Sequence, residues 1–155
     1  YHKKYVLPGS ESEGKCMTIK ELSQLYYLNR EIEMDKNRLA NLESIVTSAS
    51  SPELSGMPRA PGANDKVSRY VAEILDLQAI IAAKQLQCIH ERNRLERYIA
   101  DIPDSLTRQI FQCRFCEGMS WRQTACSVGN GDMAEDSVKK TCYRYLSRTN
   151  AEEKS

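Results

Sequence analysis

The sequence lacks several features that would place it at once in a large class of proteins. No apolar run approaches the roughly 20 residues that span a bilayer, and no segment resembles the apolar core of a signal peptide. Neither sign of charge dominates, with 22 Lys and Arg against 21 Asp and Glu, so bulk charge gives no signal for nucleic acid. Glycine is scarce, whereas residues of high helix propensity fill the middle of the chain. We therefore expect a cytoplasmic, helical protein of one or two small domains.

The sequence also has little that would support catalysis or metal binding. The six cysteines do not follow the spacing of small secreted scaffolds, so we expect them to be reduced. Cys113 and Cys116 can share a helix face, but zinc fingers place such a pair in a turn, and cysteine is also a small core residue. His90 lies in a charged stretch, and no nucleophile has an oriented base in the pattern. We expect no enzyme activity, no cofactor and no metal site.

Residues 1–16 differ in character from the rest of the chain. A basic and aromatic start is followed by Pro8 and Gly9 and by a polar stretch. Met17 then opens a sequence that would serve well as a native start. We expect residues 1–16 to be an upstream or vector-derived extension that takes no part in the fold.

A long helix is predicted from about Thr18 to Thr47. Thr18 and Glu21 form a capping box at its start, and Asp35 interrupts its apolar seam. The seam has the three, four and seven spacing of heptads and comprises Leu25, Leu28, Ile32, Leu39, Leu42 and Val46. Residues 48–64 hold three of the five prolines, so we expect a loop there.

A second long helix is predicted from about Asn64 to Ala100. Its apolar stripe comprises Val67, Val71, Ile74, Ile81, Cys88, Leu95 and Ile99. Gln78, Gln85 and Arg92 are expected at the alternate heptad positions, as a weak polar seam. Because neither helix can bury its stripe alone, we expect 17–100 to form a long antiparallel, coiled-coil-like hairpin, or to pair with the helices of another subunit.

Residues 101–148 are predicted to form three shorter helices. Pro103 ends the long helix, and Asp101 or Asp104 caps the next one, which should run to Glu117. Ser120 and Gln123 make a second capping box, which opens a short fourth helix. The turn residues 128–132 separate it from a fifth helix over about 133–148, with a tail at 149–155. The core is expected to contain Ile110, Trp121 and Val138.

A short helix, a turn with glycine and a helix with one polar face make up a helix-turn-helix. The fifth helix has four basic residues and no acidic one between Ser137 and Arg148. Such a strip suits phosphates and guanine edges, whereas Glu135 and Asp136 favour the helix dipole and can accept from cytosine. The candidate DNA-binding residues are Arg122, Glu135, Asp136, Ser137, Lys139, Lys140, Tyr143 and Arg144. The predicted fold is therefore all-α, a helical hairpin followed by a helix-turn-helix domain.

Two segments of this region also resemble a known family. Ile-Phe-Gln-Cys-Arg-Phe-Cys-Glu-Gly-Met-Ser-Trp-Arg-Gln-Thr-Ala at 110–125 and Ser-Val-Lys-Lys-Thr-Cys-Tyr-Arg-Tyr-Leu at 137–146 resemble phage and prophage regulators of the RinA and ArpU type. The C-terminus of these regulators is similar to the fourth region of sigma factors. Weaker likeness at 54–62, 65–67 and 74–77 extends the resemblance over nearly everything from residue 17.

The resemblance implies a small regulator made in a Gram-positive host during phage development. The family pattern puts Arg114 in the third helix, Ser120 and Trp121 at the start of the fourth, and DNA contacts along the fifth. Two departures stand out: the 129–134 turn is longer than in sigma factors, and two cysteines replace apolar residues of the third helix.

We therefore predict a homodimeric transcription regulator in the cytoplasm of a bacterial host, bound to double-stranded DNA and not to a membrane. The hairpin would serve for oligomerisation or for contact with host RNA polymerase. Two alternatives stay open. The hairpin could act as an inhibitor of a host protein, or the chain could be a small terminase-like subunit for DNA packaging.

Overall fold

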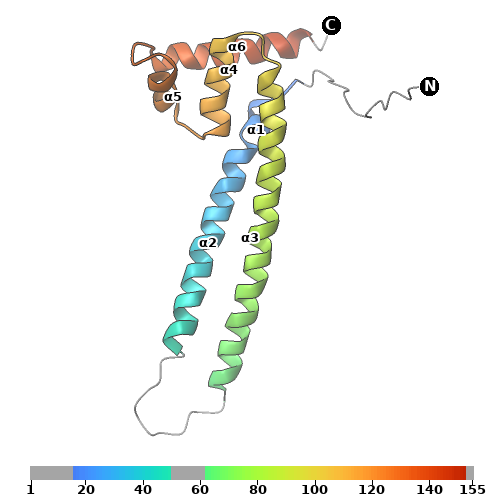
Figure 1. The fold of residues 1–155 in the computed structure, drawn as a ribbon, viewed down its shortest axis with the longest axis vertical. Helices are drawn as coiled ribbons and strands as arrows, with labels where there is room; N and C mark the ends of the chain where they lie inside the picture. The colour runs from blue at the N-terminus through green and yellow to red at the C-terminus, as the bar shows by residue number, and fades with distance from the viewer. Residues whose placement is uncertain (1–15, 50–61, 153–155) are drawn as a thin grey trace, which may run out of the picture.

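The computed structural model describes residues 16–49 and 62–152, and these residues form an all-α structure. Figure 1 shows two long helices side by side, the stalk, with shorter helices grouped at one end, the head. The stalk comprises α2 (Gln24–Ala49) and α3 (Ala63–Ala100). The head comprises α1 (Ile19–Leu22), α4 (Ser105–Phe111), η1 (Gln112–Cys116), α5 (Trp121–Val128) and α6 (Glu135–Glu152).

Some predictions fall outside the described residues. They are the extension up to residue 15, most of the 48–64 loop, and residues 153–155 of the expected tail. The beginning of that tail is helical, because α6 continues to Glu152 instead of ending at Arg148. Among the described helices, none has both the length and the apolar character needed to cross a membrane.

The prediction of one continuous first helix is wrong at Ser23. The capping box of Thr18 and Glu21 does form, but it opens the four-residue helix α1, which ends at Leu22 with Ser23 as its C-cap, and α2 starts afresh at Gln24. Leu22 and Leu25 are both buried, on either side of this break. The break therefore lets α1 pack into the head while α2 keeps its own apolar seam against α3.

α2 and α3 run in opposite directions and contact each other along their length. Lys84 of α3 pairs with two carboxylates of α2, Asp35 at 2.6 Å and Glu31 at 3.2 Å. Nearer the loop end, Arg38 pairs with Glu73. Asp35, the polar interruption of the seam, is thus neutralised in place rather than left unpaired between apolar layers.

The predicted register of α3 is wrong by one residue at every second seam position. Leu77 and Lys84 face α2, whereas Gln78, Gln85 and Arg92 are exposed. Val71, expected in the buried stripe, is 41% exposed. From Ile74 the seam steps three residues to Leu77 and then four to Ile81. The sequence had predicted a step of four to Gln78 and then three to Ile81. Both steps fit a heptad pattern, and only burial against α2 distinguishes them.

The third predicted helix forms in two parts. Asp104 caps α4 by accepting from the Thr107 N–H at 2.9 Å. From Gln112 the chain widens into the π-helical turn η1, in which the Glu117 N–H donates to the Gln112 carbonyl at 3.0 Å. The wider turn brings both Phe115 and Cys116 into the core. Gly118 then reverses the chain at a φ of 68°.

One core joins the head to the upper stalk. Phe111, Ile110 and Val138 are fully buried at its centre, so two of the three predicted core residues lie where expected. Leu95 and Ile99 of α3 belong to the same cluster, and Arg92 of α3 pairs with Glu117 at 2.7 Å. α3 is therefore shared between stalk and head. A smaller cluster holds the lower stalk together, formed by Ile32, Leu42, Leu77 and Ile81.

Candidate nucleic-acid interface

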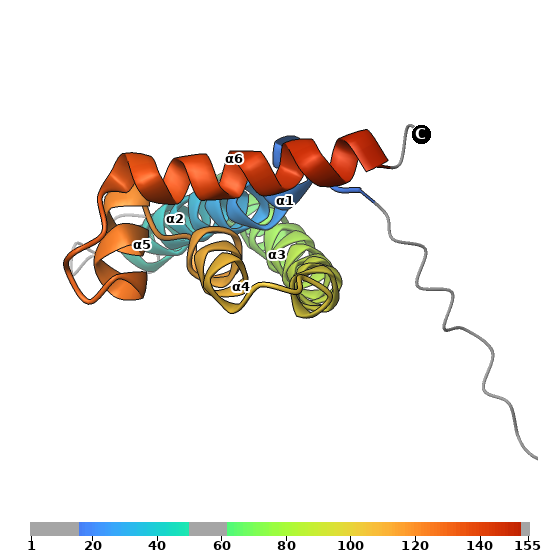
Figure 2. The same ribbon diagram turned by 90° about the horizontal axis from the view of Figure 1, so that it is seen from above.

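α6 presents one face to the core and the opposite face to solvent. Val138 and Cys142 are fully buried, and Leu146 is nearly so. On the other side, Lys140 and Arg144 are exposed. Figures 1 and 2 show α6 lying crosswise to the stalk, at the end of the molecule farthest from the last residues of α2 and the first residues of α3. Nothing in the stalk therefore obstructs its outer face.

Three cations follow one another at intervals of four residues on this outer face: Lys140, Arg144 and Arg148. All three are exposed, and none forms an ion pair with another described residue. Side chains four apart lie on one side of a helix, so these three make a continuous basic row. Arg148 is not among the predicted contacts, although its spacing of four residues from Arg144 places it on the same side of the helix.

The other predicted contact residues are distributed around this row. Asp136, Ser137 and Tyr143 are exposed on α6, and Arg122 is exposed near the start of α5. Lys139 differs from them because it pairs with Glu135 at 2.6 Å, and this hydrogen bond raises the pKa of the Lys139 ammonium. Its charge is thus already matched within the helix.

Aromatic side chains fix α6 against the rest of the head. Trp121 of α5 packs edge-on against Phe115. It also contacts Tyr143 of α6, and the ring centroids of Trp121 and Tyr143 are 6.1 Å apart. Arg114 lies over the Trp121 ring at 4.8 Å and donates to the Met119 carbonyl at 2.6 Å. Trp121 was predicted to lie in the core, but it is only half-buried and packs against the edge of the core. It connects α5 and α6, and Arg114 covers it by a cation–π contact.

The turn between α5 and α6 depends on glycine at one position. A Cβ at Gly129 would lie 2.3 Å from the Met133 Cβ and 2.9 Å from its backbone nitrogen. Asn130 and Gly131 follow with φ values of 51° and 91°. This close approach folds the long turn back on the end of α5, which sets where α6 begins.

Two cysteines of the head, Cys116 and Cys142, are buried thiols. Burial raises the pKa of Cys116 to about 11 and that of Cys142 to about 12, so both are neutral at physiological pH. A cysteine that binds zinc must be a thiolate, and burial works against that form. Within residues 16–49 and 62–152, no three His, Cys, Asp or Glu side chains come together as a metal site would require.

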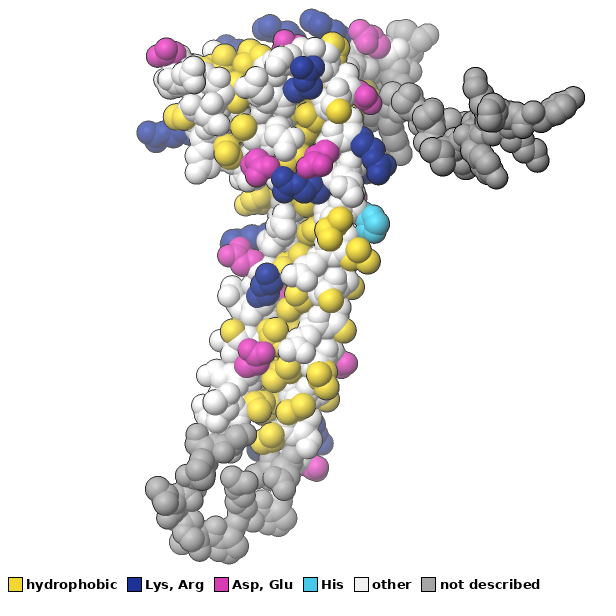
Figure 3. Space-filling view, in the orientation of Figure 1, with side chains coloured by type: hydrophobic (Ala, Val, Ile, Leu, Met, Phe, Trp, Pro, Cys, Tyr) yellow, Lys and Arg dark blue, Asp and Glu magenta, His cyan; other side chains and the backbone are white. Residues whose placement is uncertain are grey.

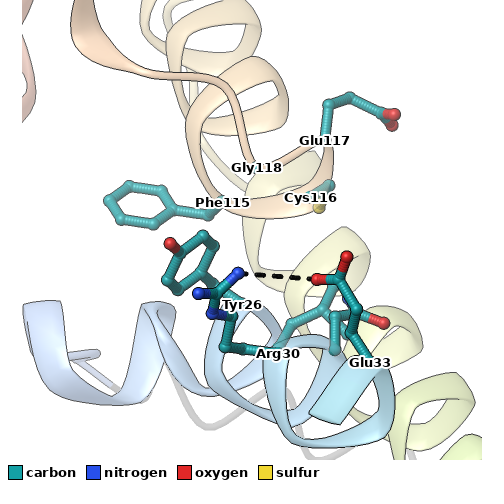
Figure 4. A pocket seen from close by; sticks show the side chains of 9 residues that line it. Tyr26, Arg30, Glu33, Phe115, Cys116, Glu117 and Gly118 are labelled. Atoms are coloured by element: carbon teal, nitrogen blue, oxygen red, sulfur yellow. Dashed lines mark ion pairs between the residues drawn. The ribbon is translucent and has the colours of Figure 1, made fainter. Parts of the chain in front are cut away.

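A shallow pocket lies where the head meets the stalk (Figure 4). It has a volume of about 270 Å³ and lies between Tyr26 of α2 and Phe115 of η1. The ion pair of Arg30 with Glu33, at 3.6 Å, forms part of its lining. The one thiol in the lining is Cys116, whose raised pKa makes it a poor nucleophile.

No protein-family model matches this chain, and neither a curated protein nor a solved structure matches it.

Proposed function

We propose that the protein is a phage-type DNA-binding transcription regulator in which α5 and α6 act as a helix-turn-helix. One observation carries the proposal: the basic row Lys140, Arg144 and Arg148 lies on the free face of a helix at the end of the molecule. At about 1.5 Å per residue, the 18 residues of α6 are roughly 27 Å long. The major groove, about 12 Å wide, admits such a helix.

The roles follow from the position of each residue along α6. Residues at the start of a recognition helix contact base edges, which assigns Asp136, Ser137 and Lys140 to base reading. Arg144 and Arg148, farther along, are assigned to phosphates, where they fix the orientation on the duplex without reading sequence. Arg122 adds a phosphate contact from α5.

The ion pair with Glu135 gives Lys139 a different role. Because Glu135 already neutralises it, releasing Lys139 to DNA would leave that carboxylate unpaired next to phosphates. In our proposal this pair supports the first turn of α6, where the acidic residues also suit the helix dipole.

The experiment that tests the proposal is selection of bound fragments from a random duplex library. The wild type is compared with Lys140→Ala/Arg144→Ala, and with Lys66→Ala/Arg69→Ala as a control that removes two exposed charges from the loop end of the stalk. We expect a motif that the wild type and the control enrich and the α6 variant does not. The proposal fails if the wild type enriches nothing, or if all three proteins enrich the same motif equally well.

A second function, contact with host RNA polymerase through the stalk, is favoured by a different observation. Tyr26 and Tyr27 are 51% and 56% exposed, and together with Arg114 they line a second pocket where the head meets the stalk. Exposed tyrosines beside arginine are typical of protein interfaces. If this surface is used, purified host polymerase should bind the wild type and bind Tyr26→Ala/Tyr27→Ala more weakly. Equal binding of both proteins would remove the tyrosine pair from consideration.

A further inference from the structure

A second apolar row runs along α3, on the side away from α2. Its spacing alternates between four and three residues, and its members are the exposed side chains Leu75, Ala79, Ala82, Leu86 and Ile89. At about 100° per residue, the row is centred about 140° from the midpoint of Leu77 and Ile81, which pack against α2. α3 therefore carries two separate heptad seams, and α2 covers only one of them.

Beyond Asp76, the exposed side of α3 is also free of charge around this row. From Leu77 to His90 the only residue of fixed charge is Lys84, and it pairs with Asp35 and Glu31 of α2. Figure 3 shows hydrophobic side chains following one another along the stalk. A helix face that stays in water normally carries charged residues, so an uncharged face several turns long indicates contact with another molecule.

We propose that this row binds the same row of a second copy of the chain, with the two α3 helices parallel. A seam that alternates four and three residues is complementary to a helix with the same spacing, and α3 of a second copy supplies one. The next core position of the row after Ile89 is Asn93, which is exposed. An asparagine at one such position is the feature that fixes register and favours a two-stranded, parallel pair.

The area of the row is at the low end of what a pair of proteins needs, as in weak, reversible interfaces. Leu75, Leu86 and Ile89 are 56–61% exposed, and Val71 lies beside them at 41%. Together with the alanines they offer on the order of 500 Å² per chain, compared with roughly 800 Å² per partner in a standard interface. Gln78 and Gln85, which flank the row, add polar surface at its rim. A helix pair of this size forms a dimer that dissociates on dilution.

This inference is drawn from the stalk alone and does not depend on the proposed DNA binding. Parallel pairing does place both heads at the same end of the dimer. Two copies of α6 would then be available to neighbouring half-sites about one turn of DNA apart.

Light scattering over a range of concentrations tests the dimer. The mass of one chain is 17.7 kDa. We expect the wild type to approach twice this mass as its concentration rises, and Leu86→Glu to keep the mass of a single chain. Ile80→Glu is the matched control, because Ile80 is 48% exposed on the same helix but lies off the row. It should behave as the wild type. A wild type that is monomeric at every concentration overturns the proposal, as does a Leu86→Glu protein that still dimerises. Circular dichroism confirms that the variants keep their helix content.

Cross-linking tests the parallel orientation. In a Cys126→Ser background, Asn93→Cys should form an intermolecular disulfide under mild oxidation, because position 93 meets itself only in a parallel pair. Gln87→Cys is the control and should not cross-link, since position 87 is exposed away from the row. A dimer in which Asn93→Cys cross-links no better than Gln87→Cys overturns the parallel arrangement.

Discussion

Gly129 shows how a single residue determines where α6 begins. The space that a Cβ would need at this position is occupied by Met133, including its backbone nitrogen. The sequence indicated a turn at 128–132, but a pattern of turn residues does not reveal which glycine is required by close contact. The close contact is with Met133, which lies four residues after Gly129 and therefore outside the four residues of a β-turn that begins there.

Gly129→Ala should therefore destabilise the head. Because the clashing atoms include backbone, the turn must shift, and we expect a loss of about 1–3 kcal/mol in the free energy of unfolding. Urea denaturation followed by circular dichroism measures it. Asn130→Gly, in the same turn, should have no such cost, since a φ of 51° suits glycine. Equal stability of Gly129→Ala and the wild type would show that the turn adopts another conformation.

The buried thiols of Cys116 and Cys142 predict a loss of stability at high pH. Their pKa values are raised by burial to about 11 and about 12, from an ordinary value of 9.0 in the unfolded chain. Between pH 9 and the raised pKa values, the thiols lose their protons in the unfolded state but keep them in the folded state. The unfolded state is therefore favoured as the pH rises, and the stability present below pH 9 is lost toward pH 12. Unfolding measured at a series of pH values should show a steeper decline for the wild type than for Cys142→Ala.

The exposed Cys126 provides the control for this prediction, since Cys126→Ala should keep the decline of the wild type. The slope is compared rather than the absolute stability, because Cys142→Ala also removes a packed side chain. If Cys142→Ala declines as steeply as the wild type, the Cys142 thiol does not contribute to the pH dependence.

At the scale of the elements, the sequence identified the helical segments but not their internal details. Capping boxes at Thr18 and Ser120 formed as expected because the bonds that define them are local. The break at Ser23 and the π-helical turn η1 were not expected, because both serve contacts between α1, η1 and the core that no local pattern contains. The register of α3 was misjudged for the same reason, since α3 carries two apolar rows and only one meets α2.

The register of α3 can be tested by two neighbouring substitutions. Leu77 is 3% exposed against α2, so Leu77→Ala should cost about 2–5 kcal/mol in the free energy of unfolding. Gln78 is exposed, so Gln78→Ala should change it by about 0.5 kcal/mol or less. Thermal or urea unfolding of the two variants decides between the registers. A larger loss for Gln78→Ala would favour the register that was first expected from the sequence.

At the scale of the whole molecule, the all-α class was confirmed, whereas the placement of α6 could not be predicted. Its crosswise position at the end of the stalk depends on long-range contacts, such as the packing of Phe111 against Tyr145 with ring centroids 5.5 Å apart. Similarly, the hydrogen bond from the Cys16 thiol to the Asn150 side-chain oxygen joins residues near opposite ends of the described chain. Heptads and caps do not encode such long-range pairs. These pairs decide which face of α6 remains free.

The free face of α6 leads to a prediction about salt. Binding of DNA through phosphates releases counterions, so the logarithm of the affinity falls linearly with the logarithm of salt concentration, by about 0.9 per phosphate neutralised. Removing Lys140 and Arg144 should weaken binding and reduce that slope by about 1 for each bound chain, because Arg144 is the one of the two that is assigned to a phosphate. The exposed charges of Lys66 and Arg69 lie at the loop end of the stalk, so their removal should leave the slope unchanged.

The affinity for duplex DNA as a function of salt, measured by fluorescence anisotropy on the wild type and these two variants, tests the account most directly. We predict tight, salt-sensitive binding by the wild type and by Lys66→Ala/Arg69→Ala, and weaker binding with the smaller slope by Lys140→Ala/Arg144→Ala. If the wild type does not bind, or if all three proteins share one slope, α6 is not the DNA-binding element.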